Sequence, residues 1–220
     1  MKVLVACEES QRVCTAFRNR GHEAYSCDIL QPSGGHPEWH IHQDVTPLIN
    51  GDCFFYTMDG EGHYITSEWD LLIAHPPCTY LSIGSACRMY PTAGNIDPVR
   101  YEMAMQAKSF FMLFLNSNAK RICVENPRPL SVVKLPKHSQ IIQPYWFGEP
   151  WSKTTLLWLR NLPDLQPTNI IKEHRPYVST GTSRYKGNSD KSGYSRKGGS
   201  SIARSKTFIG IANAMAEQWG

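Results

Sequence analysis

The sequence predicts an α/β protein with a mostly parallel central sheet and helices on both faces. Apolar runs of strand length alternate with amphipathic segments of helix length along most of the 220 residues. The links between them are short, and parallel strands are normally joined through such helical crossovers. Because 41% of the residues are hydrophobic, the chain can bury one sizeable core, and we expect a single domain over residues 1–220.

Each element is expected from a local pattern. Strands are expected where aliphatic residues cluster, at residues 2–7, 23–27, 69–74, 121–124 and 154–159, with a short third strand ending at residues 43–45. Helices are expected at residues 10–20, 97–116 and 209–219, the second with Asp97 as N-cap and Pro98 at its first position. Residues 31–42 are expected to form a loop, and residues 53–56 and 62–66 a hairpin around Asp59 and Gly60.

Four chemically capable side chains follow the expected strands. Asp28, Asp44, Cys78 and Glu125 each lie just past the end of one strand. The carboxyl ends of parallel strands meet at one edge of a sheet, where ligands bind in such folds. Helix caps can explain one or two of these residues, but the set of four predicts a functional site at this edge.

A thiol beside a carboxylic acid suits addition to an aromatic ring. Carbon 5 of cytosine becomes nucleophilic once a thiolate has added at carbon 6, and a thiolate is strongly nucleophilic even at a small ionised fraction. Cys78 is the candidate nucleophile. Glu125 is the candidate donor of a proton to ring N3, provided that burial raises the pKa of its carboxyl group.

The motifs around these residues resemble those of the cytosine-5 DNA methyltransferases. The run His75-Pro76-Pro77-Cys78 after a buried strand resembles the loop that carries the nucleophile in that family. Residues 121–127 resemble its Glu-Asn-Val element, with Pro127 in place of Val, and residues 209–215 are similar to its Gly-Asn-Ala-Val helix. Residues 3–28 are similar to its first strand, first helix and ribose-binding acid, so the resemblance extends over most of the chain.

The resemblance implies a Rossmann-like methyltransferase fold with S-adenosylmethionine as methyl donor. It implies methyl transfer to carbon 5 of cytosine, in DNA or in a cytosine nucleotide, through a covalent cysteine adduct. The catalytic residues that it implies are Cys78, Glu125, Asn126 and Lys153, the last in place of the family's Gln-Arg-Arg strand. The cofactor-binding residues that it implies are Ala6, Cys7, Glu8, Ser10, Asp28, Ile29, Asp44, Val45, His75, Pro76 and Asn213.

Positive charge gathers in one segment of the chain. The formal net charge is +4, and nine Lys or Arg residues against Glu173 and Asp190 give residues 172–206 a charge of +7, which leaves about −3 elsewhere. This asymmetry favours a polyanionic partner, although a solvated loop also explains it. By the resemblance, the basic Gly/Ser-rich residues 162–206 stand where a larger target-recognition domain is expected. The substrate-binding candidates are Pro77, Ser82, Arg184, Lys186, Arg196 and Lys197.

The remaining composition points to a cytoplasmic protein without a metal. The seven cysteines form no CxxC pair, so we expect reduced thiols, and we read His36, His40 and His42 as polar loop residues rather than ligands. The first apolar run ends at Glu8, too short for a signal peptide or membrane span, so we expect no membrane partner. The compact chain would suit a phage protein acting in the host cytoplasm.

Two other functions remain open. The turn of residues 7–11 contains no glycine where the family has a Gly-rich turn, and the recognition region is short, which suits a catalytically silent binder of nucleic acid, nucleotide or protein. Methylation of an exocyclic amino group is the second, because those enzymes also place a Pro-Pro pair after a strand. His75 and Cys78 do not match the polar and aromatic residues that flank the pair there.

Overall fold

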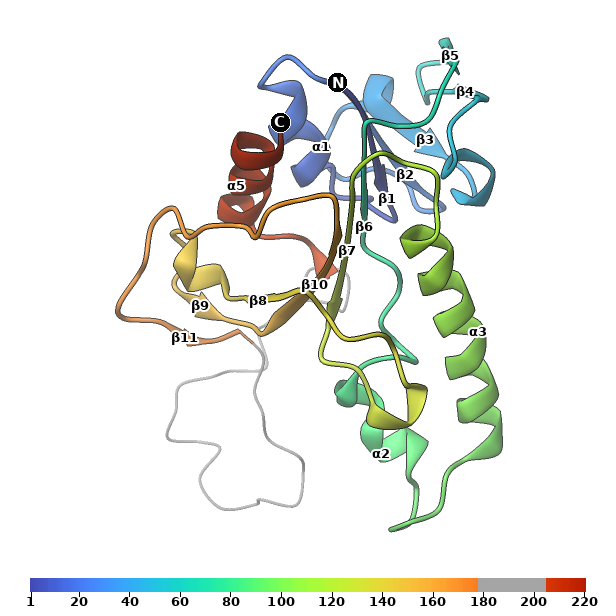
Figure 1. The fold of residues 1–220 in the computed structure, drawn as a ribbon, viewed down its shortest axis with the longest axis vertical. Coiled ribbons are helices and arrows are strands. Elements are labelled where there is room, and N and C mark those ends of the chain that lie inside the picture. The colour runs from blue at the N-terminus through green and yellow to red at the C-terminus, as the bar shows by residue number, and fades with distance from the viewer. Residues whose placement is uncertain (178–204) are drawn as a thin grey trace.

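A seven-stranded sheet forms the centre of the computed structural model, which describes residues 1–177 and 205–220 (Figure 1). The order of the strands is β3-β2-β1-β6-β7-β10-β8. They are β1 Lys2–Ala6, β2 Glu23–Asp28, β3 His40–His42, β6 Leu71–Ala74, β7 Ile122–Pro127, β8 Gln140–Ile142 and β10 Thr155–Arg160. The prediction of an α/β protein with a mostly parallel sheet is confirmed.

Only one strand of this sheet runs against the others. β3, β2, β1, β6 and β7 pair in parallel, whereas β10 pairs antiparallel with β7 on one side and with β8 on the other. The sheet is therefore mixed, which is common at the edge of an otherwise parallel sheet.

Helices cover both faces of the sheet (Figure 1). Alternate residues of β1 point to opposite faces: Leu4 and Ala6 share a core with Phe111 of α3, and Val3 and Val5 share a core with α1 and α5. The helices are α1 Arg12–Arg18, α2 Ala86–Met89, α3 Pro98–Leu115 and α5 Ile209–Trp219. Both faces are thus buried, as the aliphatic strands predict.

Smaller elements lie around the sheet. The expected hairpin is present as β4 Cys53–Tyr56 and β5 Gly62–Ile65, and β9 Trp151–Ser152 pairs with β11 Arg175–Pro176. Short 3₁₀ turns occur at Pro37–Trp39, Thr46–Leu48, Ile83–Ser85, Ser131–Val133 and Pro144–Trp146. None of the helices in the described ranges is long and apolar enough to cross a membrane.

Two expectations about strands were wrong. The region expected as a loop contains the 3₁₀ turn Pro37–Trp39 and β3, which ends at His42 rather than at Val45. β7 continues past Val124 to Pro127, because β10 pairs with it as far as Thr155 opposite Pro127. In both cases pairing with a neighbouring strand, rather than local hydrophobicity, determines where the strand lies.

The strand order reverses next to β1. The chain proceeds from β1 outward to β2 and β3, and then returns to the other side of β1 with β6 and β7. The loops after β1 and β6 therefore leave the sheet in opposite directions. Such a switch point opens a crevice at the carboxyl ends of the strands.

The start of α3 provides a test of the fold. Oδ1 of Asp97 accepts a hydrogen bond from the backbone N–H of Arg100 at 2.8 Å, as expected of an N-cap. We predict that Asp97→Ala lowers the free energy of unfolding by about 1 kcal/mol, because one N–H of the first turn loses its acceptor. Denaturant unfolding measures this change. Asp97→Asn keeps an acceptor and should remain close to wild type; an equal loss in both variants would contradict the capping role.

Candidate active site

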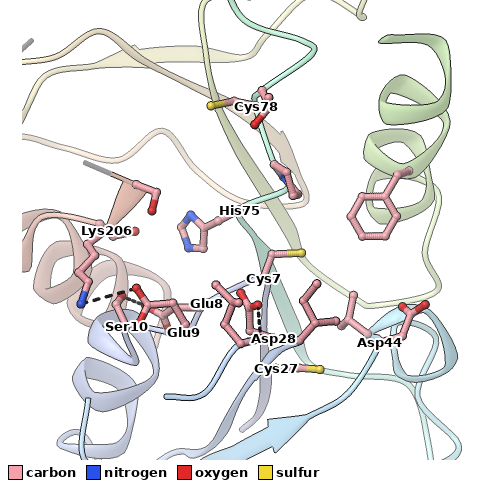
Figure 2. Close-up of a pocket in the computed structure, with 18 of the residues that line it drawn as sticks. Cys7, Glu8, Glu9, Ser10, Cys27, Asp28, Asp44, His75, Cys78 and Lys206 are labelled. Atoms are coloured by element: carbon pink, nitrogen blue, oxygen red, sulfur yellow. Dashed lines mark hydrogen bonds and ion pairs between the residues drawn. The ribbon is translucent and has the colours of Figure 1, made fainter. Parts of the chain in front are cut away.

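A cavity of about 610 Å³ opens at the carboxyl ends of β1, β2 and β6 (Figure 2). It lies at the switch point of the sheet, where the loops after β1 and β6 diverge. Eight of the residues predicted from the sequence to bind a cofactor line it: Cys7, Glu8, Ser10, Asp28, Ile29, Asp44, Val45 and His75. Cys78 and Pro77 belong to the same lining, so the structure places the predicted nucleophile beside the predicted cofactor residues.

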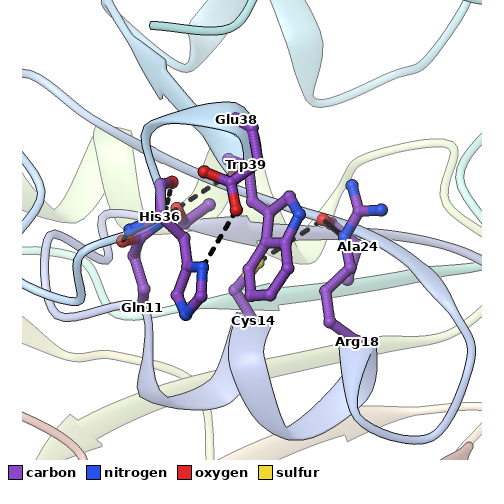
Figure 3. A network of polar contacts seen from close by, with 8 residues as sticks. Gln11, Cys14, Arg18, Ala24, His36, Glu38 and Trp39 are labelled. Carbon is purple, nitrogen blue, oxygen red and sulfur yellow. Dashed lines mark hydrogen bonds and ion pairs between the residues drawn. The ribbon is translucent and has the colours of Figure 1, made fainter. Parts of the chain in front are cut away.

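The turn after β1 is tight although it contains no glycine. Cys7 and Gln11 adopt the left-handed conformation, with φ of 58° and 56°. This conformation costs a residue with a side chain roughly 1–2 kcal/mol. The Gln11 side chain offsets the cost, because its Nε2 donates to the carbonyl of His36 at 2.7 Å and its Oε1 accepts from the His36 N–H at 3.1 Å (Figure 3). The loop after β2 is thereby fixed against the turn.

A carboxylate of the chain itself occupies the start of α1. Oε1 of Glu8 accepts from the N–H of Val13 at 2.7 Å, and Oε2 accepts from the N–H of Cys14 at 3.1 Å. Glu8 is buried, and burial raises the pKa of its carboxyl group despite these bonds and the nearby His75. The N–H groups that hold phosphate in many nucleotide-binding folds are therefore already engaged here.

Two aspartates form the other side of the cavity (Figure 2). Oδ1 of Asp28 accepts from the Leu30 N–H at 2.9 Å, and Oδ1 of Asp44 accepts from the Thr46 N–H at 2.8 Å. Burial raises the pKa of Asp28, whereas the bonds from Thr46 lower the pKa of Asp44. Each carboxylate is held by the backbone in an orientation that presents it to the cavity.

Cys78 lies in the loop after β6, half-buried. Its carbonyl accepts the N–H groups of Leu81 and Ser82 at 3.1 and 3.0 Å, so the loop turns tightly just past the thiol. Burial raises the pKa of the thiol, with a further contribution from the charge of Glu125, and Lys153 acts in the opposite direction. At rest the group is therefore a thiol.

Asn126 connects the Pro-Pro turn to β7. Its Nδ2 donates to the carbonyl of Pro76 at 3.0 Å, and the residue is almost completely buried. Pro76 and Pro77 have no N–H to donate, so this carbonyl is one of the few backbone groups by which the turn can be held. Asn126 thus positions Cys78 rather than lining the cavity.

Glu125 lies on β7 and, with Lys153, borders a small second pocket rather than the main cavity. Its Oε2 lies 3.3 Å from Nδ1 of His75, and its side chain is 18% exposed. Burial acts to raise the pKa of this carboxyl group, but the bond to His75 and the charges of Lys153 and His75 outweigh it, and the pKa is lowered. The expectation that burial raises this pKa was therefore wrong, because the sequence does not reveal that His75 and Lys153 lie next to Glu125.

Lys153 acts electrostatically on both the thiol of Cys78 and the carboxyl group of Glu125. It acts on the pKa of both Cys78 and Glu125, and its Nζ lies 6.0 Å and 5.8 Å from the ring centres of Tyr177 and Phe208. Its backbone N–H donates to Oε1 of Gln143 at 2.9 Å. The structure thus brings together three of the residues predicted to be catalytic, with Asn126 behind them.

Some predicted residues lie elsewhere. Ala6 is completely buried within β1, Pro76 is buried behind the lining, and Asn213 is on the exposed side of α5, so none of the three lines the cavity. Ser82 follows the nucleophile loop. Arg184, Lys186, Arg196 and Lys197 lie outside the described residues.

Other lining residues were missed from the sequence. Lys206 approaches Oε1 of Glu9 at 3.6 Å and donates to Oγ of Ser33 at 2.6 Å, which joins the end of the basic segment to the turn after β1. Ser205, Thr207 and Phe110 also line the cavity. The charge pattern of the sequence identifies the basic run that contains Lys206, but no local pattern predicts that Lys206 pairs with Glu9.

The three histidines near Cys27 make protein contacts. Nδ1 of His40 lies 2.8 Å from Oγ of Ser26, and Nε2 of His42 lies 2.9 Å from the carbonyl of Ile29. His36 stacks on Trp39 (Figure 3). Across residues 1–177 and 205–220, no group of His, Cys, Asp and Glu side chains is arranged to hold a metal ion.

Comparisons of the chain with protein-family models and with curated proteins find no match.

The cap on α1 provides a second test. We predict that Glu8→Ala lowers the free energy of unfolding by about 1–2 kcal/mol, because two buried N–H groups lose their acceptor. Glu8→Gln keeps one carbonyl acceptor and should lose about half as much. Denaturant unfolding of both variants measures the difference, and an unchanged stability of Glu8→Ala would rule out the cap.

Proposed function

We propose that this protein transfers a methyl group from S-adenosylmethionine to carbon 5 of cytosine, in DNA or in a cytosine nucleotide. The observation that carries the proposal is the electrostatic coupling between the Cys78 thiol, which lines the cavity just past β6, and the carboxyl group of Glu125 on the adjacent strand β7. This pair supplies the nucleophile for carbon 6 and the proton for N3 that the reaction requires.

The polarity of the cavity supports S-adenosylmethionine over a dinucleotide. Glu8 uses the N–H groups at the start of α1, which a pyrophosphate would need. The ionisable lining includes the acids Glu8, Glu9, Asp28 and Asp44, against Lys206 and His75. A phosphate is repelled by such a surface, whereas a positively charged sulfonium is attracted.

The size and the donor set of the cavity also fit this cofactor. Small-molecule sites occupy roughly 300–1,000 Å³, and about 610 Å³ lies within that range. Asp28 would accept hydrogen bonds from the ribose hydroxyls, as an acid after the second strand does in other nucleoside sites. Asp44 would accept from the adenine amino group. When bound, the cofactor supplies an electrophilic methyl group on sulfur.

The reaction begins with a shift of one proton. At rest Cys78 is a thiol and Glu125 a carboxylate, because the pKa of the first is raised and that of the second is lowered. Moving the thiol proton to the carboxylate gives the reactive pair of thiolate and carboxylic acid. Lys153 stabilises the thiolate, and Asn126 holds the turn that positions it.

The bonds then change on the cytosine ring. Sγ of Cys78 bonds to carbon 6 while Glu125 gives its proton to N3. The electron pair released at carbon 5 would then bond to the methyl carbon as the bond from that carbon to the donor sulfur breaks, its electron pair remaining on sulfur and leaving a neutral thioether. Loss of the proton from carbon 5 to a base and cleavage of the bond from carbon 6 to sulfur restore the ring. The proton on N3 returns to Glu125, and the thiolate is regenerated.

The nucleic-acid partner rests on the charge of the sequence. Residues 172–206 carry +7, a charge that would neutralise phosphates of a nucleic acid. With so short a segment we expect low sequence selectivity, or a substrate whose cytosine is already unstacked.

Substitution of Cys78 tests the proposal. Cys78→Ala should abolish methyl transfer and covalent trapping by a 5-fluorocytosine substrate, because no adduct can form, while calorimetric binding of S-adenosylmethionine is kept. The assay uses tritiated cofactor with double-stranded DNA, single-stranded DNA, RNA and deoxycytidine nucleotides.

The same assay separates the other candidate functions. Unchanged turnover in Cys78→Ala would overturn the cysteine mechanism, and mass spectrometry of the product nucleoside distinguishes carbon 5 from the exocyclic amino group. A wild-type protein that binds no S-adenosylmethionine would instead be a silent binder.

The pKa directions predict the dependence of the rate on pH. The reactive pair of thiolate and acid holds as many protons as the resting pair, so its fraction is constant between the lowered pKa of Glu125 and the raised pKa of Cys78. We therefore expect kcat/KM to be flat through neutral pH. The value of kcat/KM should fall at pH values below the pKa of Glu125, where both Cys78 and Glu125 are protonated. It should also fall at pH values above the pKa of Cys78, where both groups have lost their protons.

Steady-state rates across pH, with a deoxycytidine oligonucleotide, measure this profile. In Glu125→Gln most of the rate should be lost, and the residual rate should rise about tenfold per pH unit through neutrality, because the thiol proton then has to leave to solvent. The same rise in the wild-type protein would contradict the mechanism, because it would show that the thiol ionises independently of Glu125.

A further inference from the structure

His75 stands between the cavity and Glu125. It follows β6 directly, and its backbone N–H donates to the carbonyl of Ala6 at 2.9 Å, so its position is fixed by the central strands. Its side chain is only 9% exposed and belongs to the cavity lining. Figure 2 shows the ring extending toward the side of the cavity where Ser10 and Lys206 lie.

The two ring nitrogens have different surroundings. Nδ1 lies 3.3 Å from Oε2 of Glu125, whereas Nε2 is buried and has no hydrogen-bond partner anywhere in the described part of the chain. A buried polar atom without a partner costs about 1–3 kcal/mol. Such an atom on a cavity wall is explained by a ligand that completes its bonding.

The groups around Nε2 define the chemistry of that ligand. The acids Glu8 and Glu9 on this side are already engaged, Glu8 by the N–H groups of α1 and Glu9 by Lys206. Ser10, Lys206 and Thr207 add hydrogen-bond donors. Asp28 and Asp44 lie on the other side, so an anionic group in the cavity meets its donors near His75.

The ionisable groups that face His75 come from several elements. Glu125 approaches from β7, and Glu8 interacts with the ring electrostatically from the turn after β1. Lys153 acts beside Glu125 from the link between β9 and β10. Cys7 and Cys78 share the cavity wall with the ring. An imidazolium donates through both nitrogens and so can serve a carboxylate on each side.

We propose that His75 binds the carboxylate of the methyl donor through Nε2 while it holds Glu125 through Nδ1. The inference rests on the proposed function and assigns one residue to both halves of the site. The same ring that recognises the amino-acid end of the donor orients the acid for the cytosine. His75 is thus a positioning residue for Glu125 and a specificity residue for the donor.

Two substitutions test the two ring nitrogens of His75 individually. The amide of Asn is short and lies near the place of Nδ1, so His75→Asn keeps a group for Glu125 and loses the contact at Nε2. The amide of Gln reaches the place of Nε2, so His75→Gln has the opposite effect. Both variants keep a neutral polar group at this position.

Calorimetry with S-adenosylmethionine and with its decarboxylated form tests the contact. His75→Asn should bind S-adenosylmethionine about tenfold or more weakly, because a hydrogen bond to a charged group is lost, and should bind the decarboxylated form as wild type does. His75→Gln should stay within about threefold of wild type for both ligands. The decarboxylated ligand also reports that the variants are folded.

The pH profile of kcat/KM tests the contact between Nδ1 of His75 and Glu125. In His75→Gln the limb at low pH should move to higher pH, because both the bond and the charge of His75 that lower the pKa of Glu125 are lost; in His75→Asn the bond is kept and only the charge is lost, so the limb should move less. A structural role alone would change both measurements to the same extent in the two variants.

The outcomes distinguish the two proposals. If wild type binds S-adenosylmethionine and His75→Asn weakens both ligands equally or neither, the role of His75 is overturned and the proposed function stands. If wild type binds no S-adenosylmethionine, the proposed function is overturned, and this role for His75 is overturned with it.

Discussion

The parallel pairing of β1 with β2 on one side and with β6 on the other determines where the chemistry of this protein lies. Val3 to Ala6 pair with both neighbours, so the three strands end at the same level of the sheet. The turn after β1, Asp28 at the end of β2 and His75 just after β6 are consequently held around one cavity. β7 extends the row by pairing with β6, which brings Glu125 toward the loop of Cys78. If this register shifted by one residue, the alternation that buries both faces of β1 would be lost as well.

The acidic groups of the site are each paired with a hydrogen-bond donor or a cation. The acids of the cavity wall outnumber its basic groups, and each acid is held by backbone N–H groups or by a lysine, so that its position is fixed. At rest Cys78 is a thiol and Glu125 a carboxylate, whereas the proposed reaction needs a thiolate at Cys78 and a carboxylic acid at Glu125. A small reactive fraction is then always present near neutral pH, and the cysteine is protected from oxidation while it is a thiol.

Much of the fold was predictable because it depends on local patterns. The aliphatic strands, the Asp97 cap of α3 and the hairpin around Gly60 follow from hydrophobic periodicity and turn chemistry. β3 was predicted about three residues too far along the chain and β8 was not predicted, because both are three residues long and contain polar side chains, and pairing with β2 and β10 stabilises them. In the site, strand ends identified Asp28, Cys78 and Glu125. The left-handed turn at Cys7, the cap by Glu8 and the link from Lys206 to Glu9 depend on tertiary contacts that no local pattern encodes.

The contact between Tyr177 and Phe208 has an evolutionary consequence. Their rings lie 4.8 Å apart, edge to face, and close the chain on either side of the intervening basic stretch. The core therefore holds the two ends of that stretch close together, and the entropy of closing a loop grows slowly with its length. A change in chain length between Tyr177 and Ser205 would therefore cost the sheet little, whereas Lys206 and Thr207 are held by contacts with Ser33 and Arg12. Selection can thus alter the length of this segment while the residues that line the cavity stay unchanged.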